Sequence, residues 1–289
     1  MKLRLMVVES IAYRTHEFEG TRLQLNLIGD CTMTNTSNAK KEGQKTARHE
    51  VNGFGEGLKK LSRRKSEKTA DIDQRLLGAV EQGNLQLVES LVEAGANVNA
   101  RNSDGTTALI RAAQMDNAEV LQLLLSKGAD VDARDEEGTS AVGWAAIADS
   151  TKCVEILTNA GCDVNARCLI GMTPLHRAAQ NRNAEVIGLL VEAGADMEVR
   201  DDFGHGPLHA AVAFRSREGV YTLLEHGCDV NSRSRSGATA LMFAAGRGLA
   251  EIVEILLTYN ADVKARYKGK TALEWATDLN QVKTVELLR

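Results

Sequence analysis

The sequence predicts an all-α fold, a solenoid of stacked helix-turn-helix units joined by hairpin-like turns. A fixed period of 33 residues is the first observation, because a period of this length is typical of repeat architectures. It is carried by three series: Gly95, Gly128, Gly161, Gly194 and Gly227; Gly105, Gly138, Gly171, Gly204 and Gly237; and Arg101, Arg134, Arg167, Arg200, Arg233 and Arg266.

Two short helical segments in every period are the second observation. In one unit the first segment reads TTALIRAAQMDN, with small residues at helical spacing, and the second reads AEVLQLLLSKG. Its valine and leucines recur at i, i+3 and i+4, which is typical of a helix with one buried face. The glycine that follows suits a left-handed C-cap, and the polar ADVDARDEEG segment favours a turn.

The first helices carry the most specific motif. Residues 171–179 read GMTPLHRAA and residues 206–209 read GPLH. This pattern resembles the ankyrin repeat family. The resemblance implies that the threonine and histidine of the motif form a structural hydrogen-bonding pair. It also implies that a partner meets the tips of the turns and the inner face of the first helices.

The repeats define the expected domains. The array occupies residues 71–289, and its first and last units carry polar residues suited to capping a solenoid. We expect a short segment with strands at 1–32 and a disordered basic linker at 33–70. The expected units are about 71–101, 102–134, 135–167, 168–200, 201–233, 234–266 and 267–289.

Composition and motifs exclude several function classes. The five cysteines have no C-x-x-C spacing, which argues against a zinc site and a disulfide framework and favours a reducing compartment. Phosphate-binding, metalloprotease and nucleophile-elbow motifs are absent from the sequence. No apolar run approaches the roughly 20 residues of a membrane span. We therefore expect no catalytic residue, cofactor, metal or membrane span.

An unusual turn points to a binding site. Leu169, Ile170 and Met172 occupy a position where turns normally carry polar residues. Aromatic residues and arginines at exposed repeat positions complete a set typical of binding hot spots. The alternative is packing between units. We name the set the candidate tip surface: Trp144, Ile147, Leu169, Ile170, Met172, Arg177, Phe203, His205, Phe214 and Phe243.

Other features have two interpretations each. The arginine series is either a row of guanidinium groups for an acidic peptide or a set of exposed ion pairs with neighbouring acids. Asn99, Asn165 and Asn231 each follow a leucine by eight residues. That context resembles hydroxylated asparagines of ankyrin repeats, and the alternative is a structural turn asparagine.

The basic run at 59–65 is either an import signal or tether, with Ser66 as a phosphorylation candidate, or a solvated linker. Residues 1–70 hold 14 Lys+Arg against 8 Asp+Glu, a net charge of +6, which leaves −10 for the array out of the total of −4. An acidic array argues against nucleic acid as the main ligand.

These observations predict a non-enzymatic, monomeric scaffold or adaptor that binds another protein in the cytoplasm. Nuclear localisation through residues 59–65 is the alternative compartment. The alternative function is a regulatory subunit that masks or recruits an enzyme.

Overall fold

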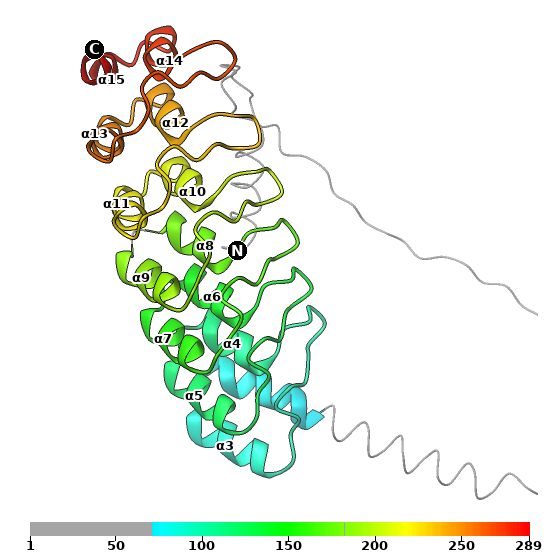
Figure 1. Ribbon diagram of the computed structural model, residues 1–289. Helices are drawn as coiled ribbons and strands as arrows, with labels where there is room; N and C mark the ends of the chain where they lie inside the picture. Colours follow the sequence, from blue (N-terminus) through cyan, green and yellow to red (C-terminus); the bar gives the residue numbers. More distant parts are fainter. Residues whose placement is uncertain (1–70, 182) are drawn as a thin grey trace, which may run out of the picture. The chain divides into compact units, whose positions relative to one another are not determined.

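The computed structural model describes residues 71–181 and 183–289. The predicted strands of 1–32, the basic linker, its import run and Ser66 lie outside these residues. The described part is built from pairs of antiparallel helices, and each pair is followed by an extended turn (Figure 1). Within this part of the chain no strand forms, and the turns contain only isolated bridges such as Arg134 to Ser140. The all-α prediction is therefore confirmed for the array.

The helices alternate between a first and a second position in each pair. Residues 71–81 are helical and pair with α3 (Leu85–Glu93). The following pairs are α4 (Ala108–Gln114) with α5 (Ala118–Ser126), α6 (Ala141–Ala148) with α7 (Thr151–Asn159), α8 (Pro174–Gln180) with α9 (Ala184–Glu192), α10 (Pro207–Ala213) with α11 (Arg217–Glu225), α12 (Ala240–Gly246) with α13 (Ala250–Thr258), and α14 (Ala272–Asp278) with α15 (Val282–Leu288).

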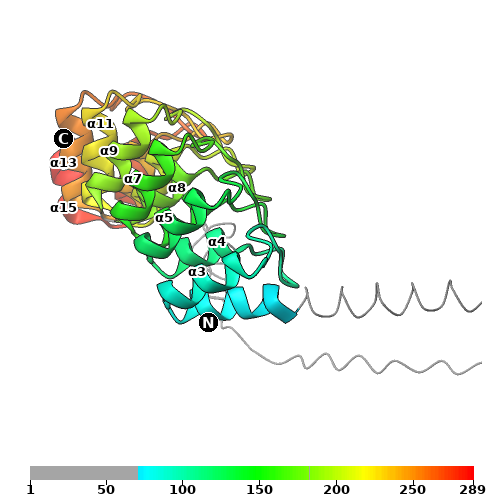
Figure 2. The ribbon, with the colours of Figure 1, turned by 90° about the horizontal axis from the view of Figure 1, so that it is seen from below.

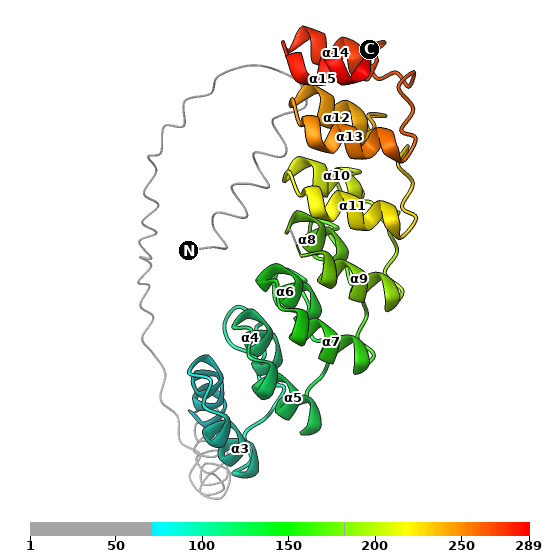
Figure 3. The same ribbon diagram turned by 90° about the vertical axis from the view of Figure 1, so that its left-hand side faces the viewer.

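First and second helices form separate rows. The even-numbered helices from α4 to α14 follow one another in one row, and the odd-numbered helices from α3 to α15 form the other (Figure 3). The turns project together from one side of the stack (Figure 2). The two rows therefore leave two faces, one with the turns and first helices and one with the second helices.

The residue composition of each helix matches its row. The first helices are rich in alanine and are buried almost all round, as in α12, where every residue from Ala240 to Gly246 is buried. The second helices bury one stripe, such as Val120, Leu121 and Leu124 of α5. Small side chains let the first helices pack closely between two neighbours, while the one-sided helices face solvent.

Reversal points in the chain use left-handed backbone. At Asn260, which stands where other units have glycine, φ is 62°, a conformation that asparagine tolerates better than most residues. Gly171 needs glycine for a second reason, because a Cβ there would lie 2.8 Å from the backbone nitrogen of Asp202 in the next turn. The turns are therefore packed against one another at their tips.

Candidate protein-binding surface

Backbone hydrogen bonds join the tips of successive turns. The amide of Leu169 donates to the carbonyl of Glu137 at 2.9 Å, and the amide of Asp202 donates to that of Ile170 at 3.1 Å. Equivalent bonds run from Glu136 to Asp104 and from Arg235 to Gly204. The tips of five consecutive units thus form a continuous hydrogen-bonded edge, which fixes the positions of the side chains that they carry.

Arginine side chains also join successive turns, by hydrogen bonds to the backbone of the next unit. Arg134 and Arg167 each donate from Nη1 to the backbone carbonyl of the arginine 33 residues later, at 3.1 and 2.8 Å. Arg101 and Arg233 make the same donation to Arg134 and Arg266. The predicted ion pairs are also present, for example between Arg167 and Asp202 at 3.3 Å. The contacts of the arginines with backbone carbonyls were not predicted from the sequence. The recurrence of arginine every 33 residues was the available signal, because each bond joins equivalent positions of two units.

The three candidate asparagines bond to the following unit. Oδ1 of Asn165 accepts from the amide of Asp196 at 2.8 Å, and its Nδ2 donates to the carbonyl of Gly194 at 3.1 Å. Asn99 makes the same two bonds two units earlier, with Asp130 and Gly128, and Asn231 accepts from the amide of Asp262 at 2.7 Å. These side chains have a structural role between units, while their hydroxylation stays a prediction.

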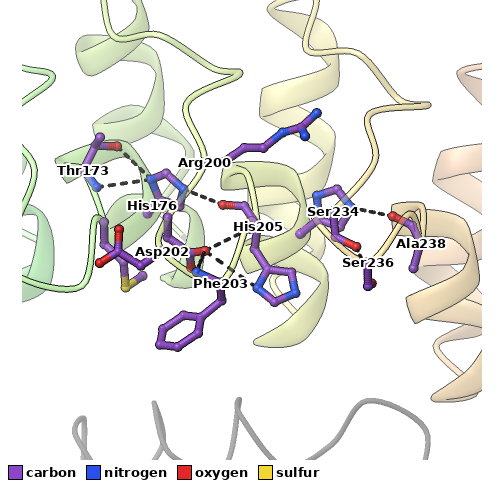
Figure 4. Close-up of polar contacts among 12 residues, drawn as sticks. Thr173, His176, Arg200, Asp202, Phe203, His205, Ser234, Ser236 and Ala238 are labelled. Atoms are coloured by element: carbon purple, nitrogen blue, oxygen red, sulfur yellow. Dashed lines mark hydrogen bonds and ion pairs between the residues drawn. The ribbon is translucent and has the colours of Figure 1, made fainter.

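Buried histidines hold the turns onto the first helices (Figure 4). Nδ1 of His176 accepts from the amide and hydroxyl of Thr173 at 3.2 and 2.8 Å, and its Nε2 donates to the carbonyl of His205 at 3.0 Å. The pair implied by the resemblance is therefore present. Nε2 of His209 likewise donates to the carbonyl of Ala238 at 3.2 Å. Burial lowers the pKa of both imidazoles to about 4, so they are neutral at pH 7.

His205 lies at the base of its turn and is only 6% exposed. Asp201 Oδ1 accepts from the amides of Phe203 and His205, both at 2.9 Å, and lies 3.8 Å from His205 Nδ1. Burial raises the pKa of the Asp201 carboxyl. The rings of His205 and His209 each meet Phe243 edge-on at 5.8 Å. This cluster supports the turn from inside. In the described part of the chain no group of His, Cys, Asp and Glu side chains is placed to hold a metal ion.

The candidate tip surface separates into two groups. Trp144, Met172, His205 and Phe243 are buried, with 6–7% of each residue exposed. The indole Nε1 of Trp144 donates to Asp135 Oδ2 at 2.6 Å, which ties α6 to its own turn. The burial of these four residues favours the packing role that the sequence left as the alternative.

The second group reaches the surface. Leu169 is 72% exposed, and Ile147, Ile170, Arg177, Phe203 and Phe214 are partly exposed. Near Arg177, burial and the charges of Asp135 and Asp104 raise the pKa of the Glu137 carboxyl, and the guanidinium opposes this shift. Met115, which is 53% exposed at the end of α4, is a further large apolar side chain outside the candidate tip surface. Its apolar character in a helix-ending position was the available signal.

Comparison with known proteins agrees with this architecture. The family model for ankyrin repeats (3 copies) matches residues 76–168, 160–234 and 208–289. The chain therefore belongs to the ankyrin repeat family, and its fold is that of a protein–protein interaction module. A search of curated proteins gave no significant match.

Among solved structures, the chain is similar to the crystal structure of the ankyrin repeat domain of Bcl-3, described as a unique member of the IkappaB protein family. The identity is 33% and the TM-score is 0.66, over 73% of this chain and 97% of that one. Among the described helices, none combines the length and the apolar character needed to cross a membrane.

Proposed function

We propose that this chain is a non-enzymatic scaffold or adaptor that binds a partner protein through the exposed members of the candidate tip surface. The observation that carries the proposal is Leu169, a large apolar side chain that is 72% exposed on a tip fixed by backbone hydrogen bonds. Exposing such a side chain on a rigid edge has no benefit for folding, whereas burying it against a partner is favourable.

Rigidity supports the same proposal. A surface that is already ordered loses little conformational entropy when a partner docks, so more of the gross interaction energy appears as affinity. The arginine and asparagine bonds between units, together with the buried histidines, provide this order. The buried group of Trp144, Met172, His205 and Phe243 then shapes the surface, and the exposed group contacts the partner.

The partner is proposed to be a protein rather than nucleic acid, because the array carries a net charge of −10. We also propose that the chain is a monomer in the cytoplasm. The alternative is import into the nucleus through residues 59–65, and deleting that run and comparing the cellular distribution tests it.

Site-specific photo-cross-linking tests the proposal. A benzoylphenylalanine introduced at Leu169 is expected to cross-link the partner in cells, whereas the same group at Val263, which is 42% exposed, serves as the matched control. One stoichiometric enzyme among the products would favour the regulatory alternative, and several unrelated proteins would favour a scaffold. Equal products from both positions would contradict a specific tip surface.

A further inference from the structure

A groove lies on the face opposite the turns. It has a volume of about 390 Å³ and is lined by residues of the second helices α9, α11 and α13, chiefly Ala184, Arg217, Glu218, Tyr221, Ile255 and Tyr259. These three helices are neighbours in one row (Figure 1). The groove shares no residue with the candidate tip surface, so it is a separate feature of the molecule.

Two tyrosines give the groove its apolar character. Tyr221 is 46% exposed, and its ring meets that of Tyr259 almost perpendicularly at a centroid distance of 6.3 Å. Position 221 breaks the pattern of the second helices, because the residues at the same place in other units are Glu89, Gln122, Glu155, Gly188 and Glu254. Position 188, at the same place in α9, is glycine and therefore adds no side chain to this face. Tyr221 therefore places an exposed ring, in contact with the half-buried ring of Tyr259, where other units have polar residues or glycine. Exposed aromatic rings of this kind are typical of binding surfaces.

The face around the groove is acidic. The seven second helices from α3 to α15 carry eleven glutamates against Lys152, Arg217 and Lys283. At the groove itself Glu218 is part of the lining, and the hydrogen bond that the Tyr221 hydroxyl donates to the Glu225 carboxylate raises the pKa of the phenol. Arg217 is the basic residue of the lining, and its Nε lies 3.8 Å from Oε2 of Glu251, so an acidic group faces its charge. An apolar groove is thus set in a strongly negative face.

We propose that this groove docks a basic segment of a partner protein, which inserts one aliphatic or aromatic side chain between Tyr221 and Ile255. Flanking lysines or arginines complement the glutamates, and their cationic heads are attracted to the faces of the tyrosine rings. This site goes beyond the proposed tip surface. It gives the array a second binding face on the opposite side, so that two partners bind at the same time.

Fluorescence polarisation with the full chain and a labelled probe peptide tests this inference. The probe has two leucines flanked by three lysines on each side. Tyr221→Ala, which removes an exposed ring, and Ala184→Arg, which fills the groove and adds a positive charge, are each expected to weaken binding about tenfold. Replacing the probe's leucines with alanine is expected to weaken binding to a similar degree.

Leu169→Ala is the matched control on the other face, and it is expected to leave probe binding unchanged. Equal far-ultraviolet circular dichroism spectra would show that the variants are folded. Probe binding that is absent up to about 1 mM, or that falls with salt but is insensitive to Tyr221→Ala and Ala184→Arg, would overturn the proposal. A concentration-dependent dimer of the wild type that Tyr221→Ala dissolves would assign the groove to a second copy of the chain and would also overturn it.

Discussion

The side chain of Arg167 donates a hydrogen bond from Nη1 to the backbone carbonyl of Arg200, one repeat further along the chain, at 2.8 Å. The arginine series therefore acts on the backbone as well as on neighbouring acids. The guanidinium groups of four members, Arg101, Arg134, Arg167 and Arg233, each join two consecutive turns in this way. The surface formed by the tips is consequently organised before any partner arrives.

Removing one of these guanidinium groups should destabilise the array. For Arg167→Ala we expect a loss of about 1–2 kcal/mol in the free energy of unfolding, because a charge-assisted hydrogen bond and an exposed ion pair to Asp202 disappear. Urea unfolding followed by circular dichroism measures this loss. Arg200→Ala is the matched control, since Arg200 makes no such bond within residues 71–181 and 183–289, and we expect a change within about 0.5 kcal/mol.

The buried histidines should make stability depend on pH. The pKa of His176 and of His209 falls from 6.5 to about 4 on folding. Between these values the unfolded chain binds more protons than the folded chain, so stability is fully present above pH 6.5 and decreases as the pH falls toward 4. Each histidine contributes up to about 3 kcal/mol to this decrease.

A variant isolates that contribution. The raised pKa of Asp201 acts with the opposite sign, because the folded chain keeps that proton to higher pH. Urea unfolding between pH 7 and pH 4 should therefore be compared for the wild type and His209→Gln. We expect the variant to show a smaller decrease over this range, and equal decreases would contradict the assignment of a neutral buried imidazole.

Substitution of Trp144 should lower the stability of the fold, because its ring is buried. Trp144→Ala removes a ring that is 6% exposed, and we expect a loss of about 3–5 kcal/mol from the cavity that remains. Trp144→Phe keeps most of the packing but loses the donor to Asp135, so we expect about 1–2 kcal/mol. Thermal unfolding separates the two variants. A stability close to that of the wild type for Trp144→Ala would instead mean that the indole is a surface contact.

Asn165 should couple two units. Its side chain bonds to the amide of Asp196 and to the carbonyl of Gly194, so Asn165→Ala should cost about 1–2 kcal/mol. Asn165→Asp keeps the acceptor and loses the donor, and we expect a smaller loss in the free energy of unfolding.

Intact-mass measurement of the protein isolated from cells checks the modification hypothesis, since hydroxylation at Asn99, Asn165 or Asn231 adds one oxygen atom.

The regular parts of the fold follow from the sequence because they repeat. A glycine or its substitute at a fixed place, such as Asn260, marks each reversal, and the apolar stripe of the second helices marks each pair. Thr173 and His176 were recognisable because their spacing is that of the family motif. Local chemistry and periodicity are sufficient for these features, since every unit meets the same neighbours.

The surface is less predictable because exposure depends on side-chain direction and on the adjacent unit. Leu169 and Trp144 both stood out in the sequence, yet the first is 72% exposed and the second 6%. Trp144 lies on α6, a first helix whose residues from Ala141 to Ala146 are all buried, and its indole also bonds to Asp135, whereas Leu169 lies at the tip of a turn. The groove at Tyr221 and Tyr259 was also not predicted, because it forms only where side chains of three helices from successive units, α9, α11 and α13, come together.

Partner capture by a Leu169→Asp variant tests the central claim most directly. The exposed side chain makes no contribution to the core, so the variant should unfold at the same temperature as the wild type. Co-purification from cells with quantitative mass spectrometry should then show the partner reduced at least about tenfold, because a charge replaces the apolar contact. Capture at the wild-type level by a folded Leu169→Asp variant would contradict the tip surface as the binding site.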